Sequence, residues 1–282
     1  MTTVAVTAAS GNLGSEIIRA VSRLGTHSVI GLARTPAKAR HLGVEVRMGD
    51  YDSPAELEES LASVDTLLLV SGMADPDTRI EQHRNVIRAA RDAGVRKLVY
   101  TSVQGPAAGT GFSPVVQSNR QTENDVRESG LDWVIGRNGI YIEPDVEYIE
   151  TYEQAGCIAN CAGDARCGYV TRFELGYAYA RMLTEDRHDG QTYNLHGEPI
   201  TQAQLASYLS LAFEAELTYQ EMTVEEYRRD RVAELGEFLG RIIAGIYAGI
   251  RHGAMDNPSQ FRSAAGRSHQ SWADYFANLG GR

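Results

Sequence analysis

The stretch TAASGNLG at residues 7–14 decides the fold of this chain. It joins a short β-branched run to a helical pattern in which Ile17, Ile18 and Val21 share one face. Small residues at such a turn let the backbone approach a pyrophosphate, whose charge is favoured by free N–H groups and by the positive end of the helix. An ordinary tight turn is the alternative, but a strand before and a helix after are the context that a dinucleotide site requires. The stretch therefore predicts dinucleotide binding.

Short β-branched runs alternate with helical patterns over residues 1–140, as is typical of βαβ units. Several runs are continuously apolar, as expected of parallel strands that helices cover on both faces. We therefore predict an α/β fold with a Rossmann-type, doubly wound parallel sheet. The predicted strands are Thr3–Thr7, Ser28–Ala33, Val44–Met48, Thr66–Val70, Lys97–Thr101 and Asp132–Gly136.

The alternation loosens after residue 140, which favours a division into two domains. We predict that residues 1–140 form an NAD(P)-binding Rossmann domain and that residues 141–282 form a smaller α+β substrate lobe. A strand near residues 190–196 is expected to return to the main sheet. Capping residues followed by Pro, or by Glu or Gln three positions later, predict helix starts at Thr35, Ser53, Thr201 and Thr223.

The overall charge argues against some classes of partner. The formal charge is −10 at pH 7 and the basic residues are scattered, so nucleic acid is not an expected partner. The first residues carry no secretory signal, and the apolar stretch Ile242–Ile250 is too short to cross a bilayer. We expect a soluble, cytoplasmic protein that binds no membrane. The same stretch leaves two roles open, namely burial against its own domain and the interface of a homodimer.

Cysteine usage points away from a disulfide framework and from a metal site. Cys157, Cys161 and Cys167 form no Cys-x-x-Cys pair and have no histidines at ligand spacing. We expect them to pack as small apolar groups or to lie in a mobile loop. A redox-sensitive thiol is the alternative.

Arg34 closes the second predicted strand, 20 residues after Gly14, where the adenosine ribose of a dinucleotide is expected. An acidic residue there accepts from the ribose 2′-hydroxyl, whereas arginine offers a fork of donors to a 2′-phosphate. The sequence therefore favours NADP(H) over NAD(H), and Lys38 adds positive charge one helical turn further on. A solvated surface arginine is the alternative interpretation.

Several further motifs carry a family resemblance. They are GLARTPAKA at 31–39, GDY at 49–51, LLLVSG at 67–72, AGVRK at 93–97, YTS at 100–102 and RNGIY at 137–141. Together with the Gly-rich turn, they resemble the motifs of atypical short-chain dehydrogenases of the NmrA-like group, nearest to the NADPH-dependent quinone oxidoreductase and triphenylmethane reductase types. The resemblance implies a Rossmann domain, a small C-terminal substrate lobe and reductase activity toward an electrophilic small molecule.

The resemblance also implies roles for individual residues. The Gly-rich turn would hold the pyrophosphate, and Arg34 and Lys38 after the second strand would bind the 2′-phosphate. Residues at the end of the third strand would contact the adenine, and residues at the end of the fourth strand would contact the ribose. The ends of the fifth and sixth strands would line the crevice and flank the nicotinamide and substrate. In chain order, the cofactor-binding residues are Ala8, Ser10, Gly11, Asn12, Leu13, Gly14, Arg34, Lys38, Asp50, Tyr51, Ser71, Gly72, Met73, Thr101, Ser102, Arg137, Asn138 and Gly139.

Two positions depart from the family pattern. Relatives usually have glycine where this chain has Ala8, and alanine costs on the order of 1 kcal/mol if that residue needs a positive φ. Relatives commonly carry His or Lys at the place of Asn119, whose amide cannot act as a general acid but can orient a carbonyl. Asn119 and Tyr141 are the candidate catalytic residues. The alternatives are a helix-surface position for Asn119, a core aromatic for Tyr141 and a plain turn residue for Ser102.

No tyrosine in the sequence has a lysine four residues later, so the Tyr-x-x-x-Lys proton relay of typical short-chain dehydrogenases is absent. Direct hydride transfer remains, in which the cofactor supplies the hydride and the protein positions the acceptor. We predict an NADPH-dependent oxidoreductase whose partner is a quinone-like or otherwise conjugated, electrophilic small-molecule electron acceptor. The alternative is an NADP(H)-sensing regulator that binds the dinucleotide and a protein partner without catalysis. The missing relay, Ala8 and Asn119 motivate that alternative.

Overall fold

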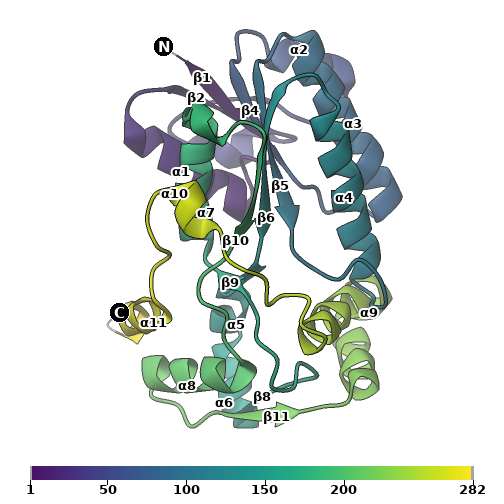
Figure 1. The fold of residues 1–282 in the computed structure, drawn as a ribbon, viewed down its shortest axis with the longest axis vertical. Helices are drawn as coiled ribbons and strands as arrows, with labels where there is room; N and C mark the ends of the chain where they lie inside the picture. The colour runs from purple at the N-terminus through teal and green to yellow at the C-terminus, as the bar shows by residue number, and fades with distance from the viewer. Residues whose placement is uncertain (1, 281–282) are drawn as a thin grey trace.

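A seven-stranded parallel sheet forms the centre of the structure, a computed structural model that describes residues 2–280 (Figure 1). Its strands are β1 (Thr3–Val6), β2 (Ser28–Ala33), β3 (Glu45–Met48), β4 (Thr66–Val70), β5 (Lys97–Val103), β6 (Asp132–Asn138) and β10 (Gln191–Leu195). The order β10-β6-β5-β4-β1-β2-β3 places β1 between β4 and β2. The predicted doubly wound α/β fold is thus confirmed. Such a strand order creates a crevice at the carboxyl ends of β1 and β4.

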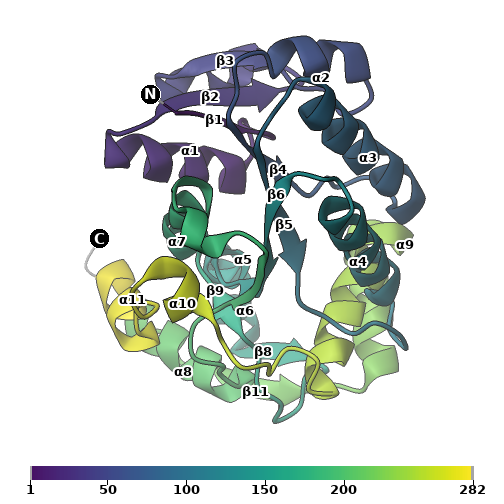
Figure 2. The same cartoon turned by 45° about the horizontal axis from the view of Figure 1, so that its top comes forward.

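Helices cover both faces of this sheet (Figure 2). One layer contains α1 (Asn12–Leu24) and α7 (Arg172–Thr184), and the other contains α2 (Pro54–Ser60), α3 (Pro76–Asp92) and α4 (Ser113–Arg127). Val4 and Val6 of β1 join the core under the first layer, whereas Ala5 joins the core under the second. Because successive side chains of a strand point to opposite faces, a strand covered on both sides must be apolar throughout.

Strands β5 and β6 extend two residues beyond their predicted ends. The prediction stops where the apolar runs stop, but Ser102 pairs in register with Arg137, and Val103 with Asn138. Glu123 of α4 binds the side chains of both Ser102 and Arg137, so these polar residues can continue the strands inside a buried layer.

Two of the four predicted helix caps form. Thr201 and Thr223 each accept from the backbone N–H three residues later, and each completes a capping box. Ser53 and Thr35 make no such bond, because their ψ angles of 75° and 87° differ from the 166° and 154° of the two working caps. The segment after Thr35 forms a short 3₁₀ helix, η1 (Pro36–Leu42), in place of the predicted α-helix.

The chain after residue 140 divides between the main sheet and a smaller lobe (Figure 1). Its further elements are β7 (Ile140–Tyr141), α5 (Glu143–Glu147), α6 (Ile149–Ala155), β8 (Cys157–Asn160), β9 (Tyr169–Val170), η2 (Asp186–His188), α8 (Gln202–Phe213), β11 (Thr218–Glu221), α9 (Val224–Arg251), α10 (Phe261–Ala265) and α11 (Trp272–Gly280). Strand β10 pairs with β6 at the edge of the sheet, and α10 packs on α7. Two small parallel pairs, β7 with β9 and β8 with β11, lie in the rest of this half.

The long helix α9 is interrupted at Gly236, whose φ of 80° and ψ of 167° are accessible essentially only to glycine. The second part of α9 carries the apolar stretch Ile242–Ile250. Gly245 in this stretch lies so close to the backbone of residues 111–112 that a Cβ atom would overlap with it. Much of the stretch is therefore buried against its own chain, and a homodimer interface stays a prediction.

The three cysteines are free thiols. Cys161 and Cys167 are fully buried, and burial raises the pKa of the Cys167 thiol, whereas Cys157 is partly exposed in β8. Between residues 2 and 280, no three His, Cys, Asp or Glu side chains are grouped so that they could hold a metal ion. Over that same range, no helix has the length and apolar character that a membrane span needs.

Asp145 of α5 is a buried carboxyl group in the smaller lobe. Its Oδ1 accepts hydrogen bonds from the hydroxyls of Tyr152, at 2.8 Å, and Tyr247, at 3.4 Å. Burial raises the pKa of Asp145 to about 6, and the two hydroxyls counteract only part of that rise. At higher pH the folded chain therefore holds a carboxylate in a poorly hydrated place.

The burial of Asp145 predicts that the free energy of unfolding depends on pH through this carboxyl group, and that Asp145→Asn removes this dependence. Because the folded pKa of about 6 exceeds the ordinary value of 3.8, ionisation of Asp145 lowers the free energy of unfolding as the pH rises through that interval. The loss amounts to at most roughly 3 kcal/mol. Asn keeps an oxygen for both tyrosines, so we expect urea denaturation to show the variant gaining stability relative to wild type between about pH 4 and pH 7. The exposed Asp164→Asn is the control. Parallel pH curves for wild type and Asp145→Asn would contradict the prediction.

Candidate functional site

The turn that follows β1 allows a ligand to approach its backbone closely. Gly11 precedes α1 and donates to the carbonyl of Ala8 at 2.9 Å. A side chain on Gly14 would overlap with that same carbonyl, so α1 begins directly against the turn. The first N–H groups of α1, from Asn12 and Leu13, have no acceptor within the helix and lie at the positive end of its dipole. These features fit a pyrophosphate.

Ala8 adopts a φ of 50°, in the left-handed region that favours glycine. The structure thus meets the condition under which alanine at this position costs on the order of 1 kcal/mol. Ser10, at the tip of the turn, is exposed. The turn therefore places an alanine in a backbone conformation that favours glycine.

Arg34 and Lys38 lie beyond the carboxyl end of β2, and both are exposed. Neither side chain forms an ion pair with another residue of the described range 2–280. Within residues 2–280, no carboxylate therefore pairs with either charge. The position of Arg34, one strand away from the Gly-rich turn, matches the expected place of an adenosine ribose.

Asp50 and Tyr51 follow β3. The Tyr51 hydroxyl donates to the carbonyl of Val70 at 2.8 Å and shares a 2.5 Å hydrogen bond with the Thr7 hydroxyl. Burial raises the pKa of Tyr51. Asp50 accepts from the N–H of Asp52 at 3.2 Å. The Tyr51 hydroxyl thus connects the end of β1 to the end of β4 by hydrogen bonds. Because the hydroxyl is engaged in this way, we expect any contact with adenine to be made by the ring.

Side chains of α3 hold the turn at residues 71–73, which follows β4. The Gly72 N–H donates to His83 Nε2 at 3.0 Å, and the Gly72 carbonyl accepts from Arg79 Nη1 at 3.3 Å. The next residue, Met73, is 84% exposed. The turn is therefore fixed on its inner side, with an apolar side chain on its outer side.

Asn119 of α4 is only 2% exposed, so the helix-surface alternative is wrong. Its Oδ1 accepts from the hydroxyls of Tyr100, at 2.7 Å, and Ser71, at 3.2 Å. Its Nδ2 donates to the carbonyl of Val115 at 2.8 Å. The Ser71 N–H donates in turn to Thr101 Oγ1 at 2.9 Å. This face of α4 packs against β5, so a polar side chain there must find partners inside the protein.

The side chains of Ser102 and Arg137 bind Glu123 of α4. Ser102 donates to Glu123 Oε1 at 2.7 Å, and Arg137 donates to the two Glu123 oxygens at 2.8 and 2.6 Å. Arg120 and Arg127 also form ion pairs with Glu123. Burial alone would raise the pKa of Glu123, but these donors and charges lower it to about 2. The two side chains therefore belong to an ion-pair cluster around the buried Glu123 carboxylate, and a cofactor contact by Ser102 or Arg137 stays a prediction.

Tyr141 lies in β7, partly buried against the core of α1 and α7. Its hydroxyl accepts from Asn138 Nδ2 at 3.4 Å, and the Arg172 guanidinium lies 5.4 Å from its ring centre. Asn138 Oδ1 accepts from the Tyr179 hydroxyl at 2.7 Å. Gly139 packs so closely on a neighbouring backbone segment that a Cβ atom would overlap with it. Asn138 and Gly139 thus fix the backbone that carries Tyr141.

Three buried residues of this region were not singled out as site residues from the sequence: Arg79, His83 and Tyr100. Arg79 and His83 are four residues apart on the face that α3 buries. Two polar residues at helical spacing on a buried face are the signal that points to them. Burial raises the pKa of Tyr100 to about 12, so its hydroxyl stays protonated at neutral pH and donates to Asn119.

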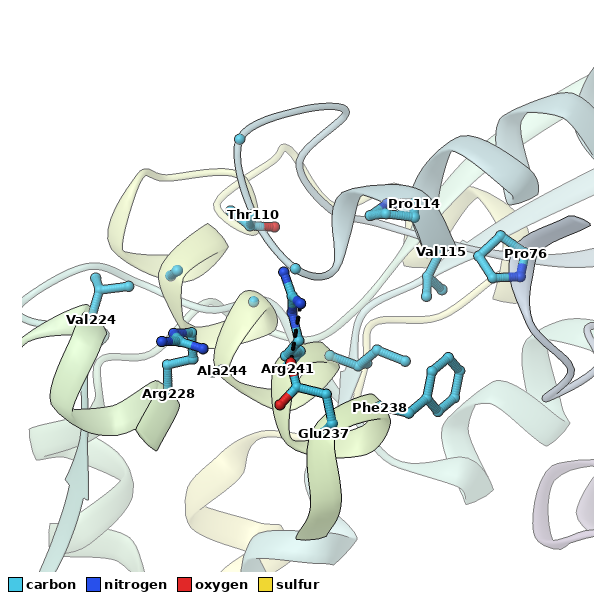
Figure 3. Close-up of a pocket in the computed structure, with 15 residues that line it drawn as sticks. Pro76, Thr110, Pro114, Val115, Val224, Arg228, Glu237, Phe238, Arg241 and Ala244 are labelled. Atoms are coloured by element: carbon cyan, nitrogen blue, oxygen red, sulfur yellow. Dashed lines mark hydrogen bonds and ion pairs between the residues drawn. The ribbon is translucent and has the colours of Figure 1, made fainter. Parts of the chain in front are cut away.

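A cavity of about 780 Å³ opens between α4 and α9 (Figure 3). Pro76, Val115 and Phe238 line one side of it. Arg241 and Glu237 lie at its rim and pair with each other at 3.1 Å. Ligand pockets of about 300–1,000 Å³ with largely apolar walls are typical of small-molecule sites.

The cavity borders the network around Asn119. Val115 lines the cavity with its side chain, and its carbonyl accepts from Asn119. Pro76 begins α3, three residues after Met73 at the end of the turn at residues 71–73. The predicted ribose region and the apolar cavity are therefore neighbours at the carboxyl edge of the sheet.

Comparisons with known proteins agree with this geometry. Residues 8–157 match the family described as NAD(P)H-binding. Quinone oxidoreductase 2 of Escherichia coli strain K12 is 33% identical over 229 residues, which cover 79% of either chain. The solved structure of the NADPH-dependent quinone oxidoreductase of E. coli complexed with NADPH is 29% identical, with a TM-score of 0.88, and covers 98% of this chain and 99% of that one. The triphenylmethane reductase of Citrobacter sp. complexed with NADP(H) is 32% identical, with the same TM-score and coverage.

The strain at Ala8 predicts that Ala8→Gly stabilises the fold. Glycine adopts a φ of 50° without steric cost, so we expect the free energy of unfolding in urea to rise by roughly 0.5–1 kcal/mol. The neighbouring Ala9 is buried and has no positive φ, so Ala9→Gly is expected to lower stability by a similar amount. Equal losses in both variants would show that residue 8 carries no backbone strain.

Proposed function

Because this chain belongs to the NAD(P)H-binding family, within its NmrA-like group, and is an NAD(P)H-dependent oxidoreductase, we propose that it transfers hydride from NADPH to a quinone-like or otherwise conjugated electrophile. The observation that carries the proposal is the position of the apolar cavity beside the turn at residues 71–73. A planar acceptor in that cavity would lie next to the part of the crevice where a nicotinamide is expected.

The residues at the sheet edge fit NADP(H). The cradle of Gly11 and Gly14 and the free N–H groups of Asn12 and Leu13 would hold the pyrophosphate. The Tyr51 ring would lie on the adenine side. Bound there, the reduced nicotinamide supplies a hydride.

The unpaired charges of Arg34 and Lys38 support a preference for NADP(H) over NAD(H). A guanidinium offers paired donors to a phosphate, whereas it gains little from a neutral 2′-hydroxyl. No residue between 2 and 280 neutralises either charge, so both remain for a 2′-phosphate.

The chain's own residues would act by positioning. Asn119 has an amide that transfers no proton near neutral pH, so its role is to hold Ser71 and the Val115 carbonyl in place. Tyr100 is protonated at neutral pH, as tyrosines ordinarily are, and donates its hydroxyl proton to Asn119 Oδ1. A quinone reduced by two electrons gains a hydride and one proton, whereas a cationic dye is neutralised by the hydride alone. With no acid assigned beside the cavity, the proton for a quinone would come from water, so the site suits electron-poor acceptors such as quinones and cationic dyes.

Turnover and cavity blocking test this function. We expect NADPH absorbance to fall when a benzoquinone, a triphenylmethane dye or an azo dye is added. Val115→Trp should fill the cavity and raise the KM for the acceptor by about tenfold or more while leaving the Kd for NADPH unchanged. Leu211→Trp, on the exposed surface of α8, is the matched control. NADPH binding without turnover of any acceptor would refute the proposal and favour the sensor alternative.

Arg34→Asp tests the choice of cofactor. A carboxylate facing a 2′-phosphate replaces attraction by repulsion, so we expect the Kd for NADPH to rise by about ten- to a hundredfold. The Kd for NADH should change by less than about threefold, because it lacks that phosphate. Calorimetry with both cofactors makes the comparison, and the exposed Arg91→Asp on α3 is the control. Equal losses for both cofactors would mean that Arg34 does not face the 2′-phosphate.

A further inference from the structure

Arg79 is a buried cation whose charge the described part of the chain does not pair with a carboxylate. It is 4% exposed, and it forms no ion pair within residues 2–280. Its Nη1 donates to the Gly72 carbonyl at 3.3 Å and its Nη2 to the Ser118 hydroxyl at 2.7 Å, while its Nε lacks a partner. A buried, unpaired charge is expensive for stability. Packing alone is therefore a poor explanation for an arginine at this position.

His83, one helical turn later, holds the other side of Gly72. Its Nε2 accepts from the Gly72 N–H, so its proton must lie on Nδ1, which donates to the Thr122 hydroxyl at 2.9 Å. The Thr122 hydroxyl donates onward to the Ser118 carbonyl at 3.1 Å. Burial and the charge of Arg79 lower the pKa of His83 to about 3, so the imidazole stays neutral. Both ring nitrogens are thus used, and the ring has one orientation.

The two side chains together fix the N–H and the carbonyl of a single residue in the turn at 71–73. Ser71 is fixed independently, through Thr101 and Asn119. A turn that is already ordered before a ligand arrives loses little conformational entropy on binding. At the adenosine end of the crevice, Arg34 contacts neither of these two side chains, whereas the Tyr51 ring lies edge-on to the His83 imidazole, with ring centres 6.2 Å apart.

We propose that Arg79 and His83 are positioning residues that pre-form the turn at residues 71–73 for the nicotinamide half of NADP(H). This inference rests on the proposed function, since it assumes that the dinucleotide crosses the crevice from Arg34 toward the cavity. Neither side chain touches the cofactor in this account. Both act through the Gly72 backbone.

Calorimetry with two probes separates this role from a general effect on folding. NADPH spans the whole crevice, whereas adenosine 2′,5′-bisphosphate carries only the adenosine half. We expect His83→Leu to raise the Kd for NADPH by about tenfold or more, the loss expected when a buried N–H loses its acceptor. The Kd for adenosine 2′,5′-bisphosphate should stay within about twofold of wild type. The KM for NADPH should rise with its Kd, with little change in kcat at saturating NADPH.

Conservative variants and a surface control complete the set. His83→Gln keeps an acceptor for the Gly72 N–H and should recover most of the affinity for NADPH. Arg79→Met should behave like His83→Leu, and Arg79→Lys should fall between Arg79→Met and wild type. Arg88→Met, on the exposed face of the same helix, should bind both probes like wild type.

The outcomes are distinct. An unchanged Kd for NADPH in His83→Leu, or an equal loss for both probes, would overturn the inference. If His83→Leu does not fold, Thr122→Val removes the acceptor of the Nδ1 proton, together with the hydrogen bond from Thr122 to the Ser118 carbonyl, and must show the same selective loss. A wild-type protein that binds NADPH but reduces no acceptor would refute the proposed reaction, while the binding comparison would still decide the role of Arg79 and His83.

Discussion

The contact between Gly14 and the carbonyl of Ala8 is the constraint on which the rest of the site depends. Without a side chain at position 14, α1 can begin directly against the turn that ends β1. The positive end of that helix then lies at the centre of the sheet, because β1 pairs with both β2 and β4. An anion bound there has Arg34 on one side and the turn at residues 71–73 on the other. The proposed dinucleotide site has three parts: the start of α1, Arg34 and the turn at residues 71–73. Their arrangement follows from the close contact at Gly14 and from the position of β1 between β2 and β4.

Buried polar groups organise the other side of the crevice. Asn119, Tyr100 and Ser71 satisfy one another between α4, β5 and the turn after β4, and His83 and Arg79 add the contact from α3. Each of these groups would be costly if it were left unpaired, so the network fixes how α3 and α4 sit against the sheet. None of these groups belongs to a Tyr-x-x-x-Lys proton relay, which the sequence lacks. A site of this kind suits acceptors that need only a hydride from the protein-bound cofactor.

Much of the fold could be predicted from local signals, whereas several side-chain roles could not. Strands β2 and β4 lie where the apolar runs predict them, and helices α8 and α9 begin after the predicted caps at Thr201 and Thr223, because those signals depend on near neighbours in the chain. The roles of Ser102 and Arg137 depend on Glu123, which reaches them only after α4 has packed. Asn119 is polar on a largely polar helix, so its burial follows from α4 packing against β5. Thr35 and Ser53 make no capping hydrogen bond because of their ψ angles, and residue type does not determine ψ.

A crystal structure of the protein with NADPH bound tests the central claim most directly. The account predicts the pyrophosphate at the start of α1, the 2′-phosphate against Arg34, and the nicotinamide beside the turn at residues 71–73, facing the cavity that Val115 lines. A cofactor whose 2′-phosphate points into solvent, or whose nicotinamide lies away from that cavity, would contradict it.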